Sequence, residues 1–261
     1  MIKETKAYLI DLDGTLFRGH TPLEGAIEWI TYLKQNHIPF LYWTNNSTRT
    51  PQALSNHLQS MGFMATPDDV YTSSLAMRDH LVQRYGTDGK KQVVYVIGEE
   101  GINDALQVNF TISAQEMNSK EEKTSLVVVG LDRSVTYKKV QRAVQAILNG
   151  ATFYATNPDR LLWTDEGLAP GAGSIVAWVA YAVDRAPIML GKPEPSFDHQ
   201  ACQRPGVKAS DTIVVGDNPR TDIRAGKAAG AYTVLLRSTL SQDLGDDIPD
   251  KTVDSLFELF A

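Results

Sequence analysis

The chain has 261 residues, of which 43% are hydrophobic and 21% charged, and its formal net charge at pH 7 is -6. This length suits one large domain or two modest ones, and the acidic balance excludes a general attraction to nucleic acid or anionic membranes. No apolar run approaches the roughly 20 residues of a membrane-spanning helix, nothing resembles a signal peptide, and the single cysteine cannot form an internal disulfide. We therefore expect a cytoplasmic protein.

The first third of the chain alternates strand and helix patterns. A short apolar run at residues 8–10 predicts a buried strand, and an amphipathic pattern that begins at Pro22 predicts a helix. A second apolar run at residues 40–43 predicts another strand, followed by helices from Pro51 and over residues 72–85. This order predicts right-handed βαβ units and a parallel sheet.

A polar break at residues 86–91 marks the expected start of an inserted domain. Beyond it the chain has an α/β pattern of its own, which one continuous sheet would not explain. We therefore expect a core domain formed by residues 1–86 and 187–261, and an insertion formed by residues 87–186. The expected strands of the insertion cover residues 93–97, 110–112, 126–129 and 153–155, its helices cover residues 99–107, 137–148 and 175–183, and a polar linker covers residues 116–123.

The last third returns to the core pattern. Strands are expected at residues 188–190, 211–215 and 233–236, and helices at residues 223–229 and 255–260. The predicted fold class is therefore α/β, with a doubly wound, Rossmann-like parallel sheet in the core and an inserted α/β domain.

Polar residues follow four of the expected core strands, at the point where each strand ends. In a doubly wound parallel sheet these tips lie along one edge, which is where ligands bind. The residues at the four tips are Asp11 and Asp13, then Thr44, Asn45 and Asn46, then Lys192, and finally Asp217 and Asp222.

The first tip carries two acids, Asp11 and Asp13, in the run Asp-Leu-Asp-Gly-Thr. Two residues apart in a strand-like backbone, they point to the same side. Carboxylates held this close repel each other, so the arrangement needs a cation or a shared proton. A hard cation with oxygen ligands, such as Mg2+, would meet this need.

This run after a hydrophobic strand resembles the first motif of the haloacid dehalogenase-like (HAD) phosphohydrolases. The other three tips match the remaining motifs of that family in order, so the resemblance covers the whole chain. Residues 44–47, 96–101 and 155–159 are similar to the C2-capped branch, which includes NagD-type nucleotidases and p-nitrophenyl phosphatases. The resemblance implies a HAD core with a C2 cap as the insertion.

The resemblance also implies catalytic roles. Asp11 would be the nucleophile that forms an aspartyl-phosphate, and Asp13 would protonate the leaving alcohol and then deprotonate the attacking water. Thr44 and the backbone groups of Asn45 and Asn46 would bind the substrate phosphate, in a cradle that we expect at a helix N-terminus.

The remaining positions concern charge and metal. Lys192 would neutralise the phosphate and the nucleophile. Mg2+ would be held by the carboxylates of Asp11 and Asp217 and by the main-chain carbonyl of Asp13, while Asp222 would orient these groups rather than bind the ion.

The implied function is Mg2+-dependent hydrolysis of small phosphomonoesters, such as sugar phosphates, nucleoside monophosphates and p-nitrophenyl phosphate. The expected partner is thus a small phosphorylated metabolite, with no nucleic acid polymer and no membrane, and a homodimer is compatible with this reading. Two alternatives stay open. One is a signalling module that accepts phosphate on Asp11, and the other is a phosphotransferase or mutase on the same scaffold.

Single residues also have structural readings. Thr44 and Asn46 could cap a helix, Asp222 could be an acid at a helix start, and Lys192 could be a solvated lysine. Substrate specificity is expected to reside in the insertion, because the motif residues contact only groups common to all phosphomonoesters. The segment at residues 157–163 is the candidate, read as a loop with an aromatic residue, Trp163.

Overall fold

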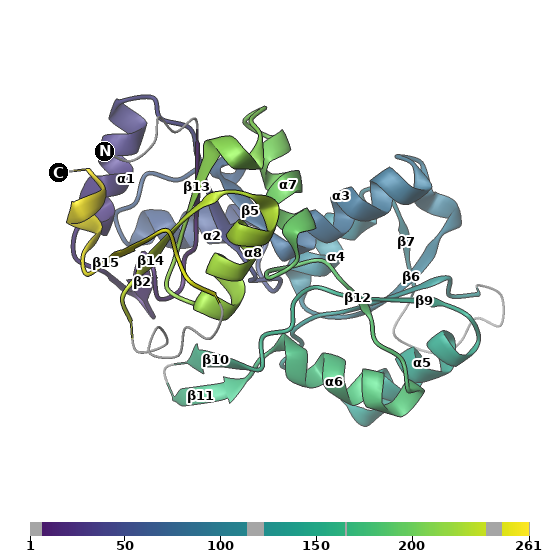
Figure 1. Cartoon of the computed structure of the whole chain (residues 1–261). Coiled ribbons are helices and arrows are strands. Elements are labelled where there is room, and N and C mark those ends of the chain that lie inside the picture. Colours follow the sequence, from purple (N-terminus) through teal and green to yellow (C-terminus); the bar gives the residue numbers. More distant parts are fainter. Residues whose placement is uncertain (1–6, 114–122, 165, 239–246, 261) are drawn as a thin grey trace. The chain divides into compact units, whose positions relative to one another are not determined.

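The computed structural model describes residues 7–113, 123–164, 166–238 and 247–260, which fall into two compact units (Figure 1). Unit 1 comprises Met1–Thr44, Pro51–Tyr71 and Lys192–Ala261, and unit 2 comprises Asn45–Thr50 and Thr72–Gly191. The chain therefore passes from one unit to the other after Thr44, Thr50, Tyr71 and Gly191.

Unit 1 is built on a sheet with the strand order β15-β14-β13-β1-β4-β5. Its central pairs are parallel, with Ile10 opposite Val215 of β13 and Tyr42 of β4. The strands are β1 (Ala7–Ile10), β4 (Phe40–Thr44), β5 (Val70–Thr72), β13 (Thr212–Gly216), β14 (Tyr232–Leu236) and β15 (Lys251–Val253), and a small hairpin is formed by β2 (Phe17–Arg18) and β3 (Thr21–Pro22). The helices are α1 (Ala26–Gln35), α2 (Pro51–Ser60), α7 (Pro195–Gln203) and α8 (Arg224–Ala229), with 3-10 turns at Pro67–Asp69, Ala209–Asp211 and Leu256–Leu259 and a π-helical turn at Pro219–Ile223.

Helices cover both faces of the unit 1 sheet. Successive side chains of a strand point to opposite faces, so each buried strand contacts helices on both. On one face Tyr8 packs edge-on against Trp29 of α1, with ring centres 5.6 Å apart. On the other face Trp43, at the end of β4, stacks on Phe197 of α7. The doubly wound arrangement predicted from the sequence is confirmed.

Unit 2 has a second sheet, with the strand order β12-β9-β8-β6-β7. Its pairs are parallel. The strands are β6 (Val93–Ile97), β7 (Thr111–Ile112), β8 (Leu126–Val129), β9 (Thr152–Ala155) and β12 (Ile188–Met189), and a separate antiparallel hairpin is formed by β10 (Leu161–Thr164) and β11 (Gly167–Pro170). The helices are α3 (Ser73–Tyr85), α4 (Glu100–Gln107), α5 (Tyr137–Leu148) and α6 (Ala172–Val183), with a 3-10 turn at Gly89–Lys91.

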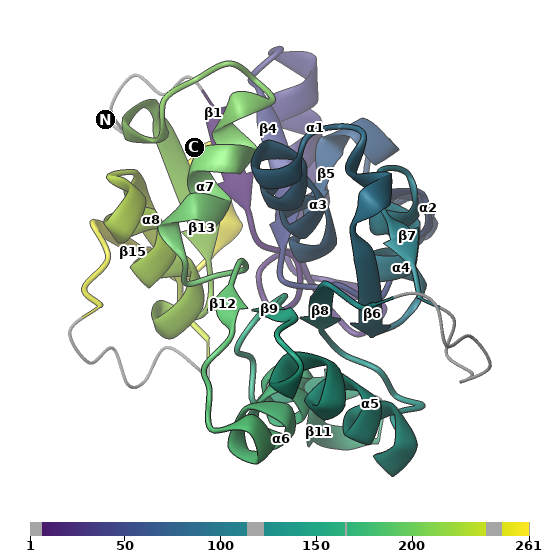
Figure 2. The same cartoon turned by 90° about the vertical axis from the view of Figure 1, so that its right-hand side faces the viewer.

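Alternate residues of the unit 2 strands face different helices. Tyr95 and Ile97 of β6 belong to the core cluster formed with α5 and α6. Val94 and Val96 belong to the cluster formed with α3 and α4. Figure 2 shows the first helix pair on one side of the sheet and the second pair on the other.

Unit 2 is larger than the insertion expected at residues 87–186. It also takes in α3, because Met77 and Leu81 of that helix are buried in the same cluster as Val94 and Val96. The polar break after α3 therefore marks the end of a helix and not the boundary of the unit. The expectation of a core strand at residues 188–190 is wrong, because β12 pairs with β9 in the unit 2 sheet.

Several local expectations need correction. The structure has helix α7, where no helix was expected, and the strand β10 begins inside the segment at residues 157–163 that was read as a loop. The side chain of Trp163 lies outside what the structure describes. The expected linker at residues 116–123 lies almost wholly outside the described residues, and the final helix is a 3-10 turn, Leu256–Leu259. In the described ranges no helix has the length and apolar character needed to cross a membrane.

Candidate active site

Three neighbouring strands of unit 1 end at the same edge of its sheet and carry polar residues there. Asp11 directly follows β1, Thr44 ends β4, and Asp217 directly follows β13. Because β13, β1 and β4 are adjacent and parallel, their carboxyl ends lie side by side. The structure therefore brings the tips of these strands together.

Lys192 lies between two carboxylates at this edge. Its Nζ forms ion pairs with Asp11 and, at 2.8 Å, with Oδ1 of Asp222, and it donates a hydrogen bond to the carbonyl oxygen of Trp43 at 3.3 Å. The ammonium group also lies 4.4 Å from the centre of the Trp43 ring, within cation–π distance. The Lys192 side chain is only 2% exposed, so the reading as a solvated lysine is wrong.

The charge of Lys192 follows from these partners. Burial alone lowers the pKa of Lys192, but the Asp11 and Asp222 carboxylates outweigh this effect and raise the pKa above its ordinary value. Lys192 is therefore a cation throughout the physiological pH range.

Negative charge nevertheless exceeds positive charge in this cluster. Asp11, Asp217 and Asp222 are buried, and one oxygen from each lies within 4.8 Å of the others. Burial raises the pKa of Asp11 well above its ordinary value against the opposing charge of Lys192, and burial together with Asp222 raises the pKa of Asp217 to about 7. Among the lysine and arginine side chains that the structure describes, only Lys192 is buried. Three buried carboxylates around one ammonium group fit a site for a hard divalent cation, whose charge would stabilise their ionised forms.

Asp222 and Asp13 differ in their contacts with the rest of the protein, and this difference indicates different roles. Both oxygens of Asp222 already accept bonds from the protein, Oδ1 from Lys192 and Oδ2 from the backbone N–H of Asn218 at 3.0 Å. This pattern suits a residue that orients Lys192. Asp13 has an exposed side chain outside the carboxylate cluster, which leaves its carboxyl group accessible to a substrate.

Gly14 allows Asp217 to approach the end of β1. It has a φ of +92°, and a Cβ atom at this position would lie 2.7 Å from Cγ of Asp217. A side chain here would therefore displace the carboxylate. The glycine of the first motif is required by packing against Asp217 at the tip of β13 as well as by the turn itself.

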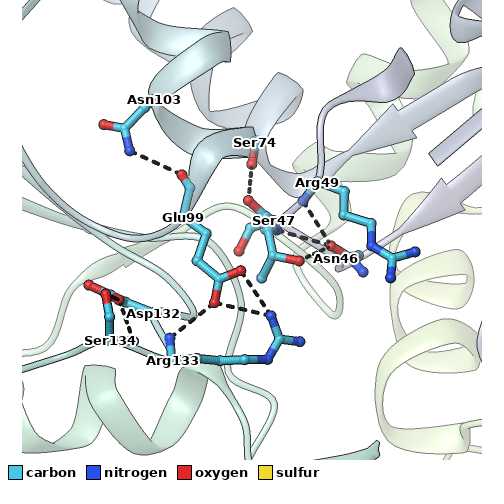
Figure 3. Close-up of polar contacts among 10 residues, drawn as sticks. Asn46, Ser47, Arg49, Ser74, Glu99, Asn103, Asp132, Arg133 and Ser134 are labelled. Atoms are coloured by element: carbon cyan, nitrogen blue, oxygen red, sulfur yellow. Dashed lines mark hydrogen bonds and ion pairs between the residues drawn. The ribbon is translucent and has the colours of Figure 1, made fainter. Parts of the chain in front are cut away.

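The segment after Thr44 differs from the expectation. Helix α2 begins only at Pro51, so Thr44, Asn45 and Asn46 are not at a helix N-terminus and do not cap one. The Oδ1 of Asn46 instead accepts hydrogen bonds from the backbone N–H groups of Thr48, at 3.0 Å, and Arg49, at 3.4 Å (Figure 3). This side-chain turn, followed by a proline that favours the first helical position, postpones the start of the helix. Asn45 and Asn46 belong to unit 2.

Sequence reasoning missed the buried acid Asp198. Asp198 of α7 is fully buried, and neither of its carboxyl oxygens has a hydrogen-bond partner among the described residues. Burial raises the pKa of Asp198 well above its ordinary value, against the opposing charge of Lys192. No sequence signal marked it, because helix α7 itself was not expected.

Two family models match the chain. The model described as haloacid dehalogenase-like hydrolase matches residues 8–111, and a HAD-hydrolase-like model matches residues 189–259. The 5'-nucleotidase YutF of Bacillus subtilis is 40% identical over 261 residues, which cover 98% of each chain. The chain belongs to the HAD-like hydrolase family. It is therefore an enzyme of the hydrolase class, as the four motifs indicated.

Further comparisons define the type of HAD-like hydrolase. An acid sugar phosphatase of Staphylococcus epidermidis is 38% identical and matches 97% of this chain and 93% of its own. The structure of a thermostable p-nitrophenyl phosphatase (NPPase) from Geobacillus stearothermophilus superimposes with a TM-score of 0.87 at 36% identity and 97% coverage of both chains. A glycerol phosphate phosphatase from Mycobacterium tuberculosis, solved in complex with magnesium, has a TM-score of 0.86 at 30% identity and covers 98% of this chain and 77% of its own. The predicted C2-capped NagD or p-nitrophenyl phosphatase type is confirmed.

Proposed function

We propose that this HAD-like hydrolase is a Mg2+-dependent phosphatase that hydrolyses small phosphomonoesters through an aspartyl-phosphate on Asp11. The observation that carries the proposal is the buried ion pair between Asp11 and Lys192 at the tip of β1, with the exposed carboxyl group of Asp13 two residues further on. Unit 1 would be the catalytic domain and unit 2 the cap.

In the first step an Asp11 oxygen attacks the phosphorus atom while the bond to the alcohol oxygen breaks. The carboxyl group of Asp13 donates its proton to the leaving alcohol. In the second step Asp13 takes a proton from water, whose oxygen attacks the phosphorus and releases inorganic phosphate from Asp11. Lys192, held by Asp222, keeps Asp11 in place and balances charge on the phosphoryl oxygens, and Thr44 donates a hydrogen bond to one of them.

The metal part of the proposal rests on the excess of buried carboxylates. Asp11, Asp217 and the main-chain carbonyl of Asp13 would hold Mg2+, which supplies positive charge to the phosphoryl oxygens when bound. The similarity to a phosphatase solved with magnesium supports this choice of ion.

The substrate class follows from the relatives. Their names indicate nucleotides, sugar phosphates, glycerol phosphate and p-nitrophenyl phosphate, all of them small phosphomonoesters. We therefore place this chain's substrate among the small phosphorylated metabolites.

The test is the release of inorganic phosphate from p-nitrophenyl phosphate with and without Mg2+, in the wild type and in Asp11→Asn. An amide is neutral and a poor nucleophile, so Asp11→Asn should lose nearly all turnover while remaining folded. Turnover above a few per cent of the wild-type value would remove Asp11 from its role. Phosphate that stays on the protein would favour the signalling module, and transfer to a second alcohol would favour the phosphotransferase.

A further inference from the structure

The segment at residues 45–50 has an unusual place in the chain. It directly follows Thr44, which ends a strand of unit 1, but it belongs to unit 2. At Lys192 the chain passes in the opposite direction, because Lys192 is the first residue of unit 1 after Gly191 of unit 2. Two residues of the proposed catalytic machinery therefore stand one peptide bond away from unit 2.

Asn45 forms hydrogen bonds with three other residues of unit 2. Its carbonyl oxygen accepts hydrogen bonds from Nδ2 of Asn157 at 2.9 Å and from the hydroxyl of Ser73 at 2.8 Å. Its own Nδ2 donates to Oδ2 of Asp159 at 3.0 Å. Asn157 is only 4% exposed, and its Oδ1 accepts from the backbone N–H of Asp159 at 3.2 Å. The Asn157 amide is thus fully engaged, with its donor directed at the Asn45 backbone.

Ser47, two residues further on, is fixed in the same way. The hydroxyl of Ser74, at the start of α3, donates to the Ser47 carbonyl oxygen at 3.0 Å (Figure 3). The hydroxyl of Thr156 donates to the Ser47 hydroxyl oxygen at 3.4 Å. These contacts are buried, so water does not compete for them.

Gly101, in the turn where α4 begins, also packs on this segment. Its backbone N–H donates to the carbonyl oxygen of Thr48 at 2.9 Å. A Cβ atom on Gly101 would lie 2.7 Å from the carbonyl oxygen of Ser47 and 2.6 Å from that of Arg49. Residues 44–47, 96–101 and 155–159, which carry the resemblance to the C2-capped branch, therefore meet around one segment.

The chain that leads into Lys192 also packs against Asn45 and Asn157, through Gly191. A Cβ atom on Gly191 would lie 2.6 Å from Oδ1 of Asn45 and 3.1 Å from Cβ of Asn157. The neighbouring Leu190 donates its backbone N–H to the carbonyl oxygen of Ala155 at 3.1 Å. The chain entering Lys192 and the chain leaving Thr44 are thus held by one stretch of unit 2.

We infer that Asn157 is a positioning residue for the proposed phosphate-binding segment. By holding the Asn45 carbonyl, it fixes the plane of the Asn45–Asn46 peptide and with it the direction of the Asn46 backbone N–H, which the family resemblance implies binds the substrate phosphate. The inference rests on the proposed phosphatase function. Without Asn157 the Asn45 carbonyl oxygen loses one donor and keeps Ser73, so the Asn45–Asn46 peptide is held less firmly, and the affinity for phosphate should fall whatever alcohol the phosphate carries.

The experiment compares Asn157→Ala with Asn109→Ala. Asn109 is a matched control in the same unit, because its Nδ2 also donates to a backbone oxygen at 2.9 Å, that of Thr87. We expect Asn157→Ala to raise the inhibition constant of inorganic phosphate and the KM for p-nitrophenyl phosphate by about tenfold each, with a smaller change in kcat. The Mg2+ concentration for half-maximal activity should stay unchanged, and Asn109→Ala should alter none of these values.

A second variant protects the test against misfolding. Ser73→Ala removes the other donor to the Asn45 carbonyl oxygen and should shift phosphate affinity in the same direction. Unchanged phosphate inhibition in both variants, or an equal change in Asn109→Ala, would overturn the inference.

Calorimetric binding of inorganic phosphate separates the two proposals. A wild type that binds phosphate without hydrolysing esters would contradict the proposed function, while the comparison of variants would still decide the role of Asn157. A wild type that neither binds phosphate nor hydrolyses esters would overturn both proposals.

Discussion

Gly14 gives the sharpest test of the proposed metal site, because it can be changed without removing any charge. A Cβ atom on Gly14 would lie 2.7 Å from Cγ of Asp217, whereas ordinary contact begins at 3.4 Å. In Gly14→Ala the two groups must therefore separate by at least about 0.7 Å, the difference between these distances, because Oδ2 of Asp217 lies nearer still.

The expected loss follows from the geometry that Mg2+ demands. This ion takes ligands at about 2.0–2.1 Å in a nearly ideal octahedron, so a carboxylate displaced by a third of that distance no longer serves as a ligand. We expect the Mg2+ concentration for half-maximal activity to rise by about tenfold or more. Alanine at the positive φ of Gly14 should also destabilise the fold by about 1–2 kcal/mol, which lowers the Tm by several degrees.

The variant Gly230→Ala separates the change in Mg2+ requirement from the loss of fold stability. Gly230 ends α8 in the same unit with a φ of +81°, and nothing lies within 4 Å of a Cβ atom there. This variant should share the loss of Tm but keep the wild-type response to Mg2+. The assay is Mg2+ activation of p-nitrophenyl phosphate hydrolysis, together with thermal unfolding by circular dichroism. Equal Mg2+ requirements in the two variants would refute the placement of the ion beside Asp217.

Three further variants test other parts of the site and the fold. Asp13→Asn should slow esters of poor alcohol leaving groups more than p-nitrophenyl phosphate, and equal losses in kcat/KM would argue against an acid in the first step. Asp217→Asn should raise the Mg2+ requirement steeply, and an unchanged activation curve would place the ion elsewhere. Burial alone raises the pKa of Asp250, but hydrogen bonds from Lys227 and Thr233 lower it below its ordinary value. The wild type should therefore have a higher Tm than Asp250→Asn above about pH 4, and the difference should shrink as the pH falls further; a constant difference would contradict this.

The sequence predicted the parallel core and three of its strand tips because these features are local, but it did not show that the strand before Lys192 pairs with β9 of unit 2. The apolar run of β1 and the acids after it are adjacent in the chain, and the topology of parallel sheets then places Asp11 and Asp217 at one edge. Pairing of side chains is not local in this sense. Nothing in the run around Lys192 shows that Asp222 binds it, or that Gly14 packs on Asp217.

The sequence pattern did not reveal helix α7 or the unit to which helix α3 belongs. In α7 the buried face includes Asp198, so an acidic residue interrupts the apolar period that would have revealed the helix. For α3 the helix itself was predicted, but its assignment to unit 2 depends on Met77 and Leu81 fitting the cluster under β6. Side-chain periodicity identifies a buried face but not the sheet that buries it.

The six-residue segment at residues 45–50 also has a consequence for protein engineering. A chimera that exchanged only residues 72–191 between two relatives would separate Ser73, Ser74 and Asn157 from the backbone oxygens to which they donate. Buried donors left facing a foreign loop would lose their partners, and the graft would be destabilised even where every apolar contact was kept. Donor and loop must therefore be transplanted together, so the smallest exchangeable module of this enzyme is discontinuous in sequence.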